Sequence, residues 1–188
     1  MPDAYKIREQ DMPEEMRLLL DVYPRSDWES HPGFKEKTRN WLRAHLMFRQ
    51  VAEVIRGDTE ALLNKEVDLR VYVGRLSHYG GNLVSSLHGH HGWEDESYFP
   101  ELSAADARFD AGLELLEQDH ADLDVVLEDI TQKANHLIRL SAVNEMEAIE
   151  SAHLVLPAAE AIEVFLNRHL GDEEELAVPI ILHHRLRG

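Results

Sequence analysis

The chain has 188 residues, which is long enough for one domain with a substantial core, and it contains no cysteine. The lack of cysteine excludes disulfides, thiolate metal ligands and a cysteine nucleophile. Acidic residues outnumber basic ones by 36 to 19, and the resulting formal net charge of -17 excludes nucleic acid as a partner, because phosphate binding needs clustered Lys and Arg. No apolar run reaches about 18 residues and no signal-peptide core follows Met1, so we expect a cytoplasmic protein with no membrane span.

Residues 1–30 are expected to form an N-terminal extension that packs on the rest of the chain, and residues 31–188 to form the main domain. Within the extension only residues 14–22 have the composition of a short helix. The domain is rich in Leu, Glu, Ala and Arg and poor in Gly and Pro, which favours helix.

Four segments of this domain have apolar or histidine residues at alternating steps of three and four, the spacing of an amphipathic helix. The segments span residues 34–55, 69–94, 113–130 and 155–180. Because modest connections separate them, the sequence predicts an all-α, up-down-up-down four-helix bundle.

Glycine and proline suggest where these helices begin and end. We expect Gly57 and Asp58 to separate the first two helices, and Phe99 followed by Pro100 to end the second. The third connection lies between residues 133 and 147. Pro157 either begins the fourth helix or kinks a longer one.

The stripe predicted to be buried on each helix contains one histidine, and two stripes also carry a glutamate four residues later. These residues are His45, His90 with Glu94, His120, and His169 with Glu173. Residues four apart lie on one face of a helix, one turn apart. A lone histidine on an apolar face is usually a packed core residue, but four histidines and two buried carboxylates with no Lys or Arg beside them favour a bound cation.

The second and fourth helices end in the same pattern. From His90 and from His169 the chain has glycine two residues later, glutamate four later, further acids, and proline ten later. This repeat predicts a site of approximate two-fold symmetry that holds two metal ions about 3.5–4 Å apart, bridged by Glu94 and Glu173. Imidazole and carboxylate donors are compatible with iron, manganese or zinc.

On these residues the sequence resembles the hemerythrin-like (HHE cation-binding) family over about residues 31–180. The family motifs are a histidine on the first and third helices and His-x-x-x-Glu on the second and fourth, and the stretch from Leu87 to Pro100 is also similar. The resemblance implies two non-haem iron ions and reversible binding of dioxygen or a related small molecule.

The chain departs from the oxygen carriers of that family at two positions. Asp124 stands where the carriers have a fifth histidine; it either binds metal, orients His120 or is solvated, and simple oxygen transport is in doubt. Glu174 stands where the carriers have an aspartate ligand, and we favour its neighbour Glu173 because Glu173 continues the buried stripe. His91 is either an extra ligand or, as we favour, a surface residue.

A ferritin-like di-iron site is the competing metal interpretation. Glu117-x-x-His120 and Glu150-x-x-His153 both fit its Glu-x-x-His motif. That site would leave His45, His90 and His169 without a role, so we rank it well below the hemerythrin-like one.

The leading functional hypothesis is a non-catalytic di-iron protein that senses, stores or buffers dioxygen, nitric oxide or iron. One alternative is a di-iron oxidase or peroxidase that uses the same centre to reduce oxygen or peroxide. A second is a metal-free helical interaction module. A sensor would pass its signal through a protein partner or through a homo-oligomer.

Overall fold

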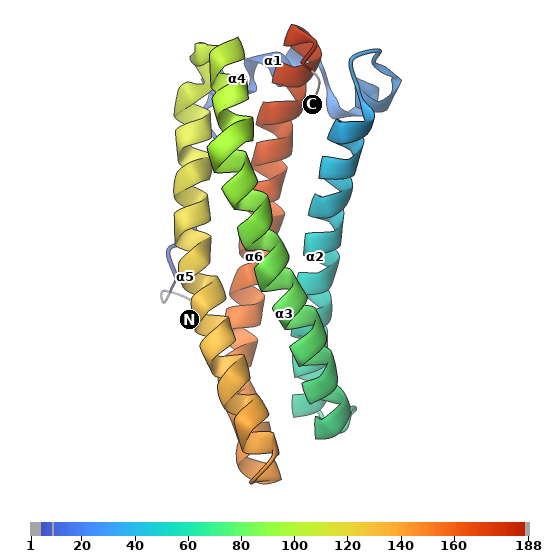
Figure 1. Cartoon of the computed structure of the whole chain (residues 1–188), viewed down its shortest axis with the longest axis vertical. Helices are drawn as coiled ribbons and strands as arrows, with labels where there is room; N and C mark the ends of the chain where they lie inside the picture. The colour runs from blue at the N-terminus through green and yellow to red at the C-terminus, as the bar shows by residue number, and fades with distance from the viewer. Residues whose placement is uncertain (1–4, 9, 187–188) are drawn as a thin grey trace.

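The computed structural model describes residues 5–8 and 10–186, and within these ranges it consists of helices and connecting loops without any strand (Figure 1). The helices of the N-terminal segment are η1 (Glu14–Arg17), α1 (Leu18–Val22) and η2 (Arg25–Ser30); the rest are α2 (Glu36–Leu63), α3 (Leu69–Trp93), η3 (Glu94–Tyr98), α4 (Phe99–Ala105), η4 (Ala107–Phe109), α5 (Asp110–Ser141) and α6 (Glu145–His184). The predicted all-α bundle is confirmed.

The four long helices run side by side along the length of the molecule (Figure 1). In that view α2 runs downward, α3 returns upward, α5 runs downward and α6 returns upward. The most extensive packing is that of α6 against α5 and α2. Apolar side chains fill the space between the helices, with Tyr72, Leu87, Leu123 and Leu166 essentially inaccessible to solvent.

Several helix boundaries differ from those expected. The boundary predicted at Gly57 is wrong, because α2 continues to Leu63; a single glycine costs a helix only about 1 kcal/mol, and packing on both sides of it outweighs that cost. The third connection does lie within the predicted range of residues 133–147, since α5 ends at Ser141 and α6 begins at Glu145. Pro157 lies inside α6, so of its two alternatives the structure favours the longer helix.

The predicted end of the second helix at Phe99 and Pro100 is also wrong. The chain passes from α3 through one π-helical turn, η3, into α4, and Pro100 lies in the first turn of α4. A first-turn proline is tolerated because its missing N–H would have no helical partner there. The π-helical turn rotates the following residues relative to α3, which matters for the site described below.

The part of the N-terminal segment from η1 to η2 packs on the upper end of the bundle in Figure 1, whereas Tyr5 and Ile7 pack against the main core cluster. Residues 14–22 are helical, as predicted, forming η1 and α1. Met12, Met16, Leu19 and Trp28 are buried in one apolar cluster with residues of α4, α5 and α6. No helix in the described ranges has the length and hydrophobicity of a membrane span.

Replacing Gly81 by Ala should raise the free energy of unfolding by about 0.5–1 kcal/mol, because alanine has less backbone entropy to lose in a helix. A Cβ added at Gly81, in the middle of α3, meets no atom within 4 Å. Gly112→Ala is the control without this gain, since its Cβ would lie 2.9 Å from Leu176 Cδ2 and 3.0 Å from Met16 Sδ. Urea denaturation of both variants measures the free energy of unfolding. An equal increase in the two variants would contradict the close packing at Gly112 and the free space at Gly81.

Candidate metal centre

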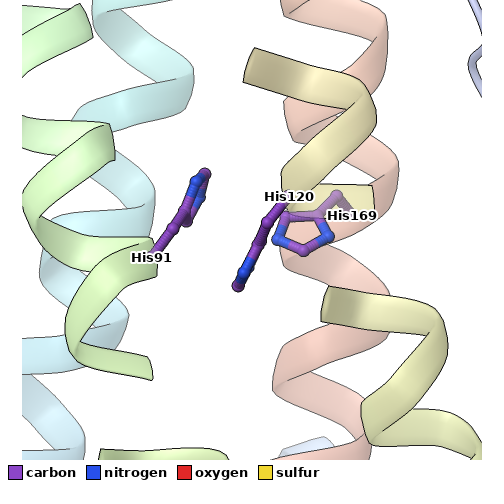
Figure 2. Close-up of side chains that lie close together, drawn as sticks. All are labelled: His91, His120 and His169. Carbon is purple, nitrogen blue, oxygen red and sulfur yellow. The ribbon is translucent and has the colours of Figure 1, made fainter. Parts of the chain in front are cut away.

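Two groups of side chains that could hold a metal ion lie inside the bundle. One contains His91, His120 and His169, and we call it the trihistidine group; the other contains His45, His90, Glu94 and Glu173, and we call it the mixed group. Within each group the potential ligand atoms lie within 4.8 Å of one another. Figure 2 shows the trihistidine group, in which side chains from α3, α5 and α6 meet between the helices.

These side chains are almost completely shielded from water. The side chains of His45, Glu94 and Glu173 are 0% exposed, and the most exposed donor, His90, reaches only 10%. In the trihistidine group the rings of His91 and His120 are stacked with their centroids 4.0 Å apart. The centre is therefore a polar cluster in the middle of an apolar core.

The two glutamates lie between the groups. Glu94 Oε1 is 2.8 Å from His90 Nε2 in the mixed group, while its Oε2 is 3.7 Å from His120 Nε2 in the trihistidine group. Glu173 Oε2 is 3.6 Å from His45 Nε2 and 3.8 Å from His169 Nε2. Each carboxylate thus adjoins both groups, as a bridging ligand must.

Many of the buried polar atoms have no hydrogen-bond partner among the described residues. They include both ring nitrogens of His91, Nε2 of His120 and His169, Oε2 of Glu94 and both oxygens of Glu173. Unpaired buried nitrogens and carboxylate oxygens are costly, and native structures rarely leave them so. These atoms are the ones that face a metal in mixed imidazole–carboxylate sites, so the residues fit a pair of cations.

A second ring of carboxylates orients the histidines from outside. Nδ1 of His45 lies 3.1 Å from Glu174 Oε1, Nδ1 of His120 lies 2.7 Å from Asp95 Oδ1, and Nδ1 of His169 lies 3.5 Å from Asp119 Oδ2. With the proton on Nδ1, each ring turns Nε2 toward the centre, the arrangement usual for metal-bound histidine.

Burial also sets the protonation of the donors. It lowers the pKa of His120 to about 3 and that of His91 still further, with neighbouring histidines adding to the effect. Both imidazoles are therefore neutral, which is the form that binds metal. Burial and the adjacent Glu94 carboxylate raise the pKa of Glu173 well above its usual value, so its ionised form depends on a nearby positive charge.

The expected ligands meet in these groups, but His91 was misassigned. We expected His91 at the surface, and this is wrong: it is 4% exposed and belongs to the trihistidine group. His90 and His91 point in different directions around α3, yet both are buried because α3 packs against α2 on one side and α5 on the other. His91 is therefore a fifth imidazole in the two groups and a candidate ligand.

The remaining candidates lie outside both groups. Asp124 is 57% exposed and pairs with His88 at 3.2 Å, so of its three alternatives the structure favours the solvated one. Glu174 contacts His45 and also accepts a hydrogen bond from Arg49 at 2.8 Å. Glu117 and Glu150 are exposed, which rules out the ferritin-like arrangement.

Sequence reasoning missed Asp95, Asp119 and Trp41. Asp119 immediately precedes His120 but contacts His169 on the next helix, so no spacing within one helix reveals it. Asp95 contacts His120 from the π-helical turn. This turn changes the direction in which its side chains point relative to α3, and no sequence pattern predicted it. Trp41 Nε1 donates to Glu94 Oε1 at 2.7 Å; its place one turn before His45 was the available sign.

Glu173→Gln should have opposite effects on the metal-free and metal-loaded protein. Without metal, the raised pKa of Glu173 means that folding at neutral pH must protonate this carboxyl group or bury its charge. The amide removes that cost, so the melting temperature should rise by a few degrees, equivalent to about 1 kcal/mol. With metal, the rise in melting temperature on loading should shrink because a ligand is lost. Differential scanning calorimetry measures both; a variant destabilised equally in both states would contradict the assignment.

Comparison with known proteins gives one result that bears on this site. The family model of the Hemerythrin HHE cation binding domain matches residues 36–181, from the first residue of α2 into the last turn of α6. Searches of curated proteins and of solved structures find no match. All the residues of the two groups lie inside the matched range, and the chain belongs to the hemerythrin HHE cation-binding domain family, a family of metal-binding helical bundles.

Proposed function

We propose that the two groups hold a pair of iron ions and that the pair reversibly binds a diatomic ligand, dioxygen or nitric oxide, in sensing or storage. The observation that carries this proposal is the presence of two adjacent groups of different donor composition that share Glu94 and Glu173. Two ions bridged by carboxylates lie about 3.5–4 Å apart, close enough to act on one small ligand.

The donor set supports iron. Imidazole and carboxylate donors without thiolates suit iron, manganese and zinc, and exclude sites that depend on soft sulfur ligands. Of these metals, iron in the ferrous state binds dioxygen and nitric oxide, and that is the chemistry it would supply here. Manganese and zinc remain compatible with the same residues.

The difference between the groups supports one position for the incoming ligand. The mixed group has two histidines and two carboxylates, whereas the trihistidine group has three imidazoles and adjoins the same two carboxylates. An ion with fewer protein donors keeps more positions open for a ligand. The incoming molecule is therefore expected on the side of His45 and His90.

Burial supports a small ligand over an organic substrate. With no donor more than 10% exposed, a bulky molecule has no approach to the centre. Tyr98 adds a polar group to this enclosure: its hydroxyl is buried without a hydrogen-bond partner among the described residues. Burial, with the nearby Glu173 and Glu94, raises the pKa of Tyr98, so the phenol keeps its proton and is available to donate to a bound ligand.

Anaerobic loading with ferrous iron followed by metal analysis and visible spectroscopy tests the proposal. We expect about two irons per chain, an absorption band that appears on exposure to dioxygen or nitric oxide, and its loss when the gas is removed. Steady consumption of dioxygen or peroxide in the presence of a reductant would replace the proposal by an oxidase or peroxidase. A chain that retains no metal would leave only a helical interaction module.

His91→Ala should lower the bound iron from about two ions to about one per chain, because the trihistidine group loses one of its three imidazoles. His88→Ala is the matched control: His88 is three residues earlier on α3, half exposed, and paired with Asp124. Metal analysis after desalting gives the stoichiometry. Equal retention in the two variants would show that His91 is not a ligand.

A further inference from the structure

We infer that Arg8 and Arg25 are positioning residues for the metal centre, one for each group, supplied by the N-terminal segment. Both precede the matched domain, which begins at residue 36. Neither arginine touches a donor directly; each holds the outer carboxylate that contacts a donor histidine. The inference rests on the proposed function, because it concerns how firmly the two ions are held.

Arg8 reaches the trihistidine group through Asp119. Its Nε and Nη2 donate to the two carboxylate oxygens of Asp119 at 3.1 and 2.8 Å, and Nη2 also donates to Asp172 at 2.6 Å. The same Asp119 carboxylate lies 3.5 Å from His169 Nδ1. The Arg8 and Asp119 side chains are only 12% and 5% exposed, so water competes little for these contacts.

Arg25 reaches the mixed group through Glu174. Its Nη1 donates to Glu174 Oε2 at 2.6 Å, while the other oxygen, Oε1, lies 3.1 Å from His45 Nδ1. Glu174 Oε1 also accepts from Arg49 of α2 at 2.8 Å. Two arginines therefore hold Glu174, one from the segment and one from the bundle.

Each arginine restricts the orientation of a carboxylate. Arg8 bonds to both oxygens of Asp119, which sets the position and the plane of that carboxylate as a single ammonium does not. Arg25 bonds to one oxygen of Glu174 and leaves the other facing His45. The fixed carboxylate in turn fixes the ring plane and the Nδ1–H tautomer of its histidine. Such outer partners typically change metal affinity by about 10–100-fold.

The N-terminal segment that carries the two arginines is anchored to the bundle by apolar contacts. Met12, Met16, Leu19 and Trp28 are buried against α4, α5 and α6, and Arg25 lies over the Trp28 ring with its Cζ 4.7 Å from the ring centroid. This anchoring keeps both arginines at their carboxylates. The N-terminal segment thus contacts the outer carboxylates of both groups, through Arg8 and Arg25, from outside the matched domain.

The two positions should differ in their dependence on the segment. Among the described residues, the hydrogen-bond partners of the Asp119 side chain are Arg8 and His169. Glu174, by contrast, keeps Arg49 when Arg25 is removed. Loss of Arg8 should therefore loosen one ion markedly, and loss of Arg25 should have a smaller effect until Arg49 is removed as well.

The test measures iron release from the loaded full chain to a coloured ferrous chelator under anaerobic conditions. Arg8→Ala should release one of its two ions about 10-fold faster than the wild type or more, and the visible spectrum of the loaded protein should change. Arg8→Lys should restore little of the wild-type rate. Arg25→Ala alone should change release less than Arg25→Ala combined with Arg49→Ala.

Arg17→Ala is the matched control, because Arg17 belongs to the same segment but is 49% exposed, and its ion-pair partner among the described residues is Glu175, at 3.0 Å. Asp119→Asn tests the same contacts from inside the bundle and should also speed the release of one ion. If the wild type binds iron but Arg8→Ala, Asp119→Asn and Arg17→Ala all release it at the same rate, the inference is overturned and the proposed function is not. Wild type that takes up no iron would instead overturn the proposed function, and the inference with it.

Discussion

The structure depends on the burial of two carboxylates, Glu94 and Glu173, among five imidazoles in the middle of an apolar bundle. Two ionised glutamates side by side in such surroundings repel each other and lose their hydration, a cost that the rest of the core cannot offset by packing. Neutral histidines supply lone pairs but no positive charge. A pair of cations, as proposed above, would satisfy the carboxylates and the imidazoles together and would couple metal binding to the stability of this region.

Around this centre, a second set of carboxylates contacts the histidines, and arginines pair with most of that set. The inner glutamates and histidines are surrounded by Asp95, Asp119 and Glu174, and the last two are in turn paired with arginines. Each outer carboxylate polarises a histidine, and each arginine prevents that carboxylate from adding an uncompensated negative charge. The N-terminal segment contributes two of these arginines, so the part of the chain outside the matched domain takes part in the organisation of the site.

Much of the fold followed from periodicity. The three-and-four spacing located all four long helices, because burying one face of a helix leaves that spacing in the sequence. The boundaries were harder, since Gly57 and Pro100 are local breakers whose effect depends on what packs beside them. Within α2 the packing outweighs the glycine, and a π-helical turn carries the chain past Pro100. Such outcomes depend on tertiary contacts that no local pattern contains.

The sequence by itself determined the helical class, the four buried stripes and six candidate donors that lie on them, because residues four apart on one helix must share a face. Only the tertiary structure decided that His91 is buried beside His120 and His169, that Asp124 faces solvent with His88, and that Asp95, Asp119 and Glu174 contact the rings of histidines on other helices. The physical reason is that spacing reports the direction of a side chain from its own helix axis. Which directions are buried, and which side chains meet there, depends on how the neighbouring helices are placed.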